Sequence, residues 1–232
     1  MTLDRRNGII LGIFYIAAAV TSIIAVVFYE QILSEQWYKT VANGLETKVL
    51  FGVLNDLFLV VSAVGTAVML FPYIRRWNEH IALGYLCFRF MEAVFIAIGL
   101  VSILGLLNLS IYYEAGSFTS EENFSGLSKV LQGFHGWTFM LGPNFMLGIN
   151  TVLYSYVLFR TGLVPKRLAL FGIITAVMVF IAGLLEMFGM IEPLSIAKGL
   201  IALPVGVFEM SLAFWLIVKG FNKQKLEKLN VR

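Results

Sequence analysis

Residues 81–107 read IALGYLCFRFMEAVFIAIGLVSILGLL, and this run decides the fold class. A helix needs ~20 mostly apolar residues to cross the ~30 Å hydrocarbon core of a bilayer, and the run exceeds that length. It also carries two charged residues, Arg89 and Glu92, well inside apolar sequence. A charge at membrane depth is unfavourable unless it faces a bundle interior or a wet cavity. The run therefore predicts a membrane-spanning helix with one polar face turned inward.

Runs of this kind recur along the chain and predict six spans, at Gly8–Phe28, Val49–Phe71, Ile81–Leu107, Gly133–Phe159, Leu168–Met190 and Ile196–Val218. The chain is 59% hydrophobic and 13% charged, whereas soluble domains are about one quarter charged. The runs are much longer than barrel strands and do not alternate, so helices are expected. We predict one all-α integral membrane domain over residues 1–232, a six-helix bundle that ends in a basic tail at residues 219–232.

Arginine and lysine gather in the segments on one side of these runs, at positions 5–6, 75–76, 160–167 and 219–232. An excess of these residues marks cytoplasmic loops, so both termini are predicted to be cytoplasmic. The net charge of +3 comes mainly from these segments and does not indicate nucleic-acid binding. The first run is longer than the ~7–15-residue apolar core of a signal peptide, so we expect it to remain as a span.

Four polar residues inside the spans are expected at one depth. Counting the helical rise of about 1.5 Å per residue from the charged inner ends places Arg89, Glu92, Asn150 and Glu209 near the middle of the bilayer. Arg89 and Glu92 are three residues apart and project from one face of their helix. Asp56 is expected about one turn further out. These five residues are the candidates for a ligand or proton site.

The charges of this layer do not balance. One arginine, which stays charged, faces up to three carboxylates at Asp56, Glu92 and Glu209. Full ionisation would leave unpaired negative charge where the dielectric constant is low. We therefore expect a bound proton, a cation or a cationic ligand. The alternative is a buried polar network that only holds the helices together.

A second set of polar residues lies near the predicted outer ends of the spans: His135, Glu186 and Lys198. Lys198 and Glu186 fall at similar heights and could pair. The set would form an outward-facing polar mouth, with His135 as its titrating group. The simpler interpretation is that residues at span ends reach the headgroups and make local hydrogen bonds.

Small residues and a proline predict details of the helix packing. Gly8 and Gly12 form a small-xxx-small pair, which lets a second helix approach closely and would suit a partner protein. Pro143 removes one backbone hydrogen bond from the fourth span and predicts a kink there. The tail at residues 219–232 is expected to be solvated, or else to lie on anionic headgroups.

The sequence offers little for covalent or metal chemistry. Its single cysteine, Cys87, permits no disulfide within the chain, and the two histidines are far apart in sequence. No zincin helix, nucleophile elbow or phosphate loop is found. We expect no metal and no cofactor, and an enzyme is the third choice of function.

Two stretches resemble a known family: YSYVLFR at residues 154–160 and LVPKRLA at residues 163–169, with Gly172 after them. Together with Arg89-x-x-Glu92 and His135, they are similar to the signature of a bacterial membrane family catalogued as domain of unknown function 4386. The resemblance covers nearly the whole chain. It implies a six-helix protein of the bacterial cytoplasmic (inner) membrane and implies no activity.

The leading hypothesis is a protein that binds or moves a small solute, a lipid-like molecule or a proton through the central polar site. The alternative is a membrane scaffold or accessory subunit whose buried charges are structural and whose outer face, at Gly8 and Gly12, binds a partner helix. Expected partners are membrane lipids, a small-molecule ligand, and either a second copy or another membrane protein. Nucleic acid is not expected.

Overall fold

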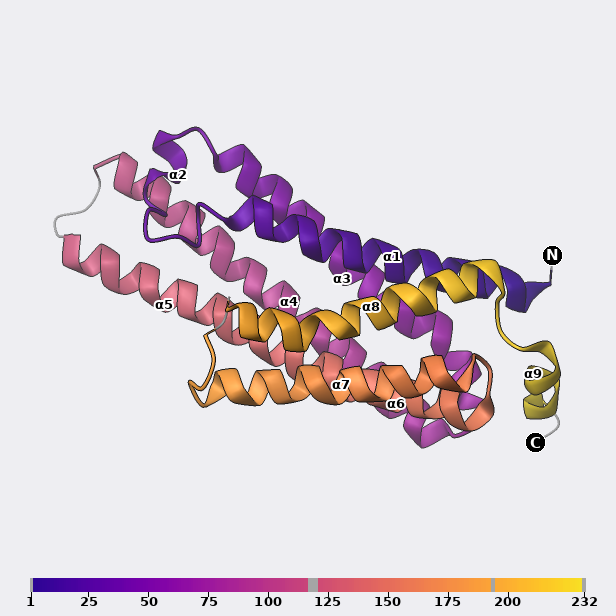
Figure 1. The fold of residues 1–232 in the computed structure, drawn as a ribbon. Helices are drawn as coiled ribbons and strands as arrows, with labels where there is room; N and C mark the ends of the chain where they lie inside the picture. Colours follow the sequence, from indigo (N-terminus) through magenta and orange to yellow (C-terminus); the bar gives the residue numbers. More distant parts are fainter. Residues whose placement is uncertain (1, 117–120, 193–194, 231–232) are drawn as a thin grey trace.

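The computed structural model describes residues 2–116, 121–192 and 195–230, and these residues form helices joined by short turns (Figure 1). Residues 231–232 of the predicted tail lie outside the described residues. In chain order the helices are α1 (Leu3–Tyr29), α2 (Lys39–Ala42), α3 (Glu46–Arg75), α4 (Glu79–Glu114), α5 (Glu121–Phe139), the wide π-type turn η1 (Met140–Met146), α6 (Leu147–Thr161), α7 (Lys166–Met187), α8 (Ile196–Val218) and α9 (Lys223–Asn230).

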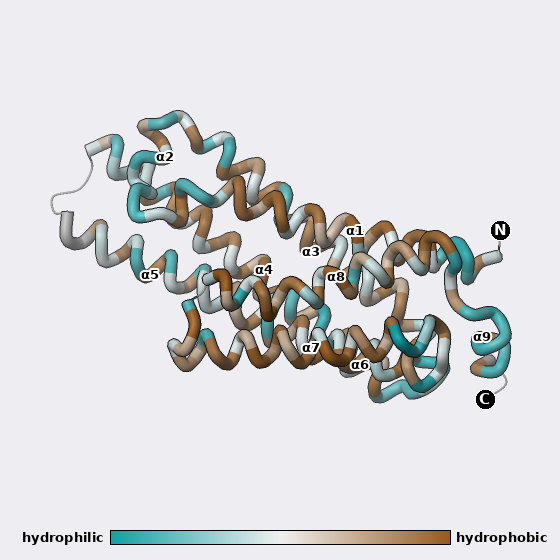
Figure 2. The backbone as a smooth tube through the Cα atoms, viewed as in Figure 1, coloured by the Kyte–Doolittle hydropathy of each residue, from teal (hydrophilic) through white to brown (hydrophobic). Residues whose placement is uncertain are grey.

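Within the described residues, five helices are long and apolar enough to cross a membrane: α1, α3, α4, α7 and α8. They correspond to five of the six predicted spans. Apolar residues occupy the middle of the bundle and polar residues gather at its two ends (Figure 2). Many large apolar side chains point outward and are exposed, as expected for helices that face lipid.

The predicted span at Gly133–Phe159 is divided into α5, η1 and α6. The helical path is continuous, but it widens into η1 around Pro143. Proline has no N–H to donate and its ring clashes with the carbonyl four residues earlier, so an α-helical turn is disfavoured at this position. The kink predicted from Pro143 thus takes the form of a wide turn, and the helix begins earlier than predicted, at Glu121.

The long helices pack into a closed ring. Helix α1 contacts α3 and α8, α3 contacts α4, α4 contacts α6, α6 contacts α7, and α7 contacts α8. The chain termini and the loop between α6 and α7 lie at one end of the bundle, and α2 with the start of α5 lies at the other (Figure 1). We call these the terminal end and the α2 end. The ring leaves an interior into which polar side chains of four helices can point.

The glycine face of α1 is not available to a partner helix, contrary to the sequence-based expectation. Gly12 packs directly on α8, where an added Cβ would lie 2.8 Å from the carbonyl oxygen of Ala213. Gly8 lies one turn away, and a Cβ added there would lie 3.6 Å from the carbonyl oxygen of Leu216. The small residues therefore close the ring between α1 and α8.

The side chain of Arg5 strengthens the same contact. Its guanidinium donates hydrogen bonds to the carbonyl oxygens of Leu216 (2.7 Å), Ile217 and Val218 (3.2 Å). These carbonyls belong to the last turn of α8 and have no partners within their own helix. Arg5 was expected only as a cytoplasmic charge, and in the structure it also caps α8.

The basic tail folds back onto the bundle and is not solvated as predicted. The chain reverses at Gly220, which has φ +73°, and α9 follows. Phe221, Leu226 and Leu229 are buried in the main hydrophobic core. The Phe221 ring lies 4.3 Å from the ring of Tyr73 on α3. Burial of these apolar residues explains why the weakly amphipathic tail docks on the protein.

Candidate functional site

Arg89 is the centre of a polar cluster inside the ring. It projects from α4 and is only 2% exposed. Its Nη1 donates to both carboxylate oxygens of Glu92, at 2.9 and 3.2 Å. Its Nε lies 3.1 Å from Oγ1 of Thr66 and 3.4 Å from the carbonyl oxygen of Ala63 on α3. The guanidinium is thereby held in one orientation between α3 and α4.

Glu209 enters the cluster from α8. Its Oε1 lies 3.7 Å from Nη1 of Arg89, which is an ion-pair distance and too long for a hydrogen bond. The same oxygen is buried and has no hydrogen-bond partner among the described residues. Glu209 is therefore attracted to Arg89 without being fixed by it.

Asn150 connects the cluster to α6. Its Nδ2 donates to Oε2 of Glu92 at 2.7 Å and to the carbonyl oxygen of Met146 at 2.7 Å. Met146 is the last residue of the wide turn η1. Asn150 thus joins Glu92 on α4 to the end of the wide turn. The cluster formed by Arg89, Glu92, Asn150 and Glu209 is called the polar cluster below.

The polar cluster contains one guanidinium and two carboxylates. If both carboxylates were ionised, it would carry a net charge of −1 inside a low-dielectric interior, where an unpaired charge is strongly destabilised. Glu92 accepts three hydrogen bonds, from Arg89 and Asn150. Glu209 has only the longer contact with Arg89. The excess negative charge therefore falls on Glu209.

Three buried tyrosines line the side of the polar cluster that faces the terminal end. The hydroxyl groups of Tyr15, Tyr85 and Tyr154 are buried and make no hydrogen bond of regular geometry among the described residues, although the Tyr15 hydroxyl interacts with the other two. The Tyr154 ring lies 6.2 Å from that of Tyr15 and 5.5 Å from that of Tyr85. Their hydroxyls are close enough to interact electrostatically with Arg89 and Glu209. Buried polar groups normally bind a protein group, water or a ligand, so these hydroxyls extend the polar interior.

The sequence-based search missed these tyrosines and Thr66. Tyrosine is common at membrane–water interfaces, where its hydroxyl stays wet. A tyrosine in the interior of an apolar run needs a partner for that hydroxyl, so its position in the run indicates a buried polar site. Tyr85 and Tyr154 also stand four residues from Arg89 and Asn150, which places them on the same helix faces.

Asp56 does not join the polar cluster, although the sequence placed it in the same lining. It is ten residues before Thr66 on α3, which corresponds to about 15 Å along the helix. Its Oδ1 lies 3.4 Å from Nδ2 of Asn55, and its carboxylate interacts with the hydroxyl of Tyr29 on α1. Asp56 thus belongs to a separate polar group nearer the α2 end.

His135 has Tyr29 on one side and Phe139 on the other, and the Phe139 ring stands between it and Lys198. The His135 ring stands edge-on to the ring of Tyr29 at 6.1 Å, and its Nδ1 is 3.4 Å from the carbonyl oxygen of Gly99. Tyr29 therefore connects His135 with Asp56. The predicted outer mouth is divided, because His135 on α5 points toward α1 and α4.

Glu186 and Lys198 form a buried ion pair, with Nζ of Lys198 2.7 Å from Oε2 of Glu186. Asn144 of the wide turn donates to the same oxygen at 3.2 Å. The ammonium also lies 5.6 Å from the centre of the Phe139 ring. The pair ties α7 and α8 to η1. No group of three or more histidine, cysteine, aspartate or glutamate side chains in the described part of the chain is placed to hold a metal ion.

A family model described as "Domain of unknown function (DUF4386)" matches residues 10–220. The matched region contains all four residues of the polar cluster, the three tyrosines and the Glu186–Lys198 pair. No curated protein and no solved structure matches the chain.

Proposed function

Because the chain belongs to the family described as domain of unknown function 4386, whose description names no activity, we propose a function from the polar cluster. The protein is a multi-pass protein of the bacterial cytoplasmic membrane, folded as one integral domain. Its polar cluster binds a proton at Glu209. The protein uses this proton to move a small solute, or the proton itself, across the membrane.

In the proposed topology the chain crosses the membrane six times. The fourth crossing uses the second half of α5, the wide turn η1 and α6, and the other five are the long apolar helices. Both termini lie in the cytoplasm. Support comes from the terminal end of the bundle, where α9 and the loop between α6 and α7 gather basic residues (Figures 1 and 2).

Reporter fusions test this topology. A green fluorescent protein fused after Arg232 should fluoresce, because it folds in the cytoplasm. Alkaline phosphatase fused after Glu114 should be active, because that residue ends α4 on the opposite side. An active phosphatase at residue 232 would contradict the topology.

One observation carries the proposed proton site: Oε1 of Glu209 is buried, has no hydrogen-bond partner among the described residues, and shares a single guanidinium with a second carboxylate. Glu92 holds that guanidinium with two hydrogen bonds and is itself fixed by Asn150. Glu92 is therefore the permanent counter-ion. Binding a proton at Glu209 makes the cluster neutral, which is the favourable state in a low-dielectric interior.

The tyrosines supply the chemistry for proton access. Hydroxyl groups both donate and accept hydrogen bonds, so a row of them with intervening water can pass a proton. Tyr85 and Tyr154 each lie one turn, about 6 Å, from the polar cluster toward the terminal end. In the proposed topology this path leads toward the cytoplasm.

Neutralising Glu209 should remove a pH dependence of stability. If the folded protein holds one proton that the unfolded chain releases, its free energy of unfolding falls by about 1.4 kcal/mol for each pH unit above the titration of a free carboxylate. Wild-type protein in mild detergent should therefore unfold at lower temperature as the pH rises above the titration range of a free carboxylate. In Glu209→Gln the contribution of this one proton, about 1.4 kcal/mol for each pH unit, should be missing from the slope while the protein stays folded.

The control is Glu79→Gln, which removes an exposed carboxylate of a surface pair with Arg75. It makes the same change of charge and should keep the wild-type slope. Glu92→Gln should remove the same contribution, because Arg89 and Glu209 then balance, and should lower stability further through the lost hydrogen bonds. A Glu209→Gln protein that keeps the slope, or that fails to insert, contradicts a proton site at Glu209.

The alternative function is a scaffold or accessory subunit in which the polar cluster is structural. It is favoured by one observation: hydrogen bonds of Arg89, Glu92 and Asn150 tie together α3, α4 and α6, and the ion pair with Glu209 adds α8. The glycine face of α1 no longer supports this alternative, since α8 covers it. Mass measurement of the gently solubilised protein separates the two functions, because an accessory subunit should retain a partner protein.

A further inference from the structure

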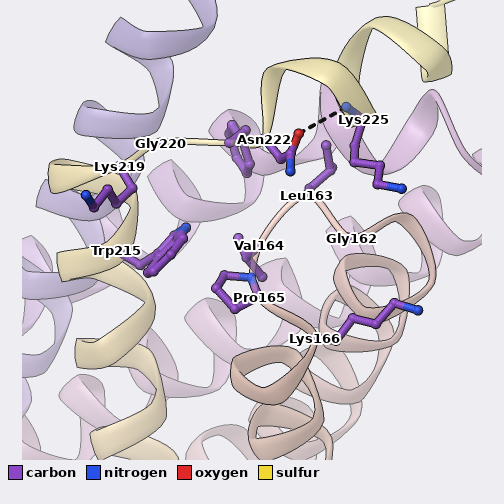
Figure 3. Close-up of a pocket in the computed structure, with 11 residues that line it drawn as sticks. Gly162, Leu163, Val164, Pro165, Lys166, Trp215, Lys219, Gly220, Asn222 and Lys225 are labelled. Atoms are coloured by element: carbon purple, nitrogen blue, oxygen red, sulfur yellow. Dashed lines mark hydrogen bonds between the residues drawn. The ribbon is translucent and has the colours of Figure 1, made fainter.

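A pocket of about 370 Å³ opens at the terminal end of the bundle and shares no lining residue with the polar cluster. It lies between the loop that joins α6 to α7, the end of α8 and the start of α9 (Figure 3). The volume is within the usual range for small-ligand sites. Docking of α9 closes one wall, since the backbone N–H of Asn222 donates to the carbonyl of Leu163 at 2.9 Å.

The charged residues that line this pocket are all cations. Lys166, Lys219 and Lys225 stand around it, and within residues 2–116, 121–192 and 195–230 no aspartate or glutamate lines it. Lys219 extends on one side, and Lys166 and Lys225 extend on the other (Figure 3). All three residues are exposed, so their flexible side chains can turn toward a bound group. A positive rim without a carboxylate favours an anionic ligand.

Neutral hydrogen-bond donors point to the same class of ligand. Trp215 lines the pocket, and its Nε1 is buried without a hydrogen-bond partner among the described residues. The first turn of α7 begins beside the pocket after Pro165, and no side chain caps it. Free N–H groups at a helix start attract anions. An oxygen-rich anion would satisfy both the indole and this helix start.

The position of the pocket indicates where the anion comes from. Trp215 is four residues, about 6 Å, from Lys219 at the end of α8. Phe214 and Val218 of the same turns are exposed apolar residues that would face lipid chains. Tryptophan followed by lysine is typical of the membrane–water boundary. The pocket therefore lies at headgroup level.

We propose that this pocket binds the phosphate group of an anionic phospholipid headgroup. The lysines neutralise the phosphate, and Trp215 with the start of α7 donates hydrogen bonds to its oxygens. The lipid chains lie along the apolar surface of α8. This proposal is independent of the proton site, and only the assignment to the cytoplasmic leaflet rests on the topology proposed above.

Native mass spectrometry of the detergent-solubilised protein tests the proposal by titration with phosphatidylglycerol or with phosphatidylcholine. Wild-type protein should bind one phosphatidylglycerol in preference to phosphatidylcholine. The variant Lys219→Gln/Lys225→Gln should bind phosphatidylglycerol roughly 25-fold more weakly, taking about fivefold for each lysine near an anionic group. Its phosphatidylcholine binding should not change.

The matched control is Lys223→Gln/Lys228→Gln, which removes two charges from the same tail helix at positions that do not line the pocket. Its phosphatidylglycerol binding should stay within about twofold of wild type, since distant charges are screened. Equal losses in the two variants would overturn the proposal, because they would indicate a general attraction to the tail.

Competition separates a lipid from a soluble phosphate compound. Inorganic phosphate and glycerol 3-phosphate should not displace bound phosphatidylglycerol at matched concentration, because the apolar contacts of the lipid are missing. Displacement by inorganic phosphate with the same dependence on Lys219 and Lys225 would overturn the lipid assignment. A lack of preference between the two lipids would overturn the anion site itself.

Discussion

Arg89→Met is expected to lower the free energy of unfolding by about 3–5 kcal/mol, the usual effect of removing one partner from a buried ion pair. The substitution keeps most of the side-chain volume but leaves Glu92 and Glu209 facing each other without a cation. It also removes the hydrogen bond to Thr66. Reversible unfolding in mixed micelles measures the change.

Two further variants identify the cause of the loss at Arg89. The triple variant Arg89→Met/Glu92→Gln/Glu209→Gln has no charge in the cluster and should recover most of the stability, because neutral replacements of buried ion networks are often tolerated. Arg89→Lys keeps the charge but loses the planar guanidinium. Its free energy of unfolding should therefore lie between those of Arg89→Met and wild type. If Arg89→Met lowers the free energy of unfolding by less than about 1 kcal/mol, the prediction is wrong and water already solvates the cluster.

Gly12→Val should open the contact between α1 and α8. An added Cβ would lie 2.8 Å from the backbone oxygen of Ala213 and 2.6 Å from Cγ1 of Ile217. A backbone atom cannot turn aside as a side chain can, so the helices must separate. We expect the free energy of unfolding to fall by about 3 kcal/mol, the upper end of the range for overpacked cores. Loosening should also free the end of α8 from Arg5, which protease susceptibility near residue 219 would report.

Gly206→Val is the control for this prediction. Gly206 also lies within α8, and a Cβ there would meet no atom within 4 Å. The control makes the same chemical change in a neighbouring helix and should alter the unfolding free energy by less than about 0.5 kcal/mol. Similar losses at both glycines would mean that valine itself, and not the close approach, is responsible.

The relative height of the four cluster residues along the bundle could be predicted from the sequence because the helical rise is the same for every α-helix. Counting residues from the charged ends placed Arg89, Glu92, Asn150 and Glu209 at one height, and the structure brings them into contact. The run lengths likewise predicted the five long apolar helices.

Direction around the helix axis could not be predicted, because it depends on which helices are neighbours. Asp56 is a different case, because its predicted height was wrong: it lies about 15 Å along α3 from Thr66 and not about one turn from the polar cluster. Gly12 appeared to be a free surface until its neighbour α8 was known. Docking of the tail depends on a core surface that only the closed ring creates, so its apolar residues alone did not predict it.

The wide turn η1 also sets the rotational phase of α6. An α-helix turns by about 100° for each residue, so moving the surplus residue of η1 elsewhere would rotate every α6 side chain by about that angle. Asn150 would then turn away from Glu92, and the hydrogen bond between them would be lost. Asn144, the residue after Pro143, donates a hydrogen bond to Glu186, the partner of Lys198, from within the same turn. The winding of this one segment therefore sets the position of Asn150 in the polar cluster and of Asn144 at the Glu186–Lys198 pair together.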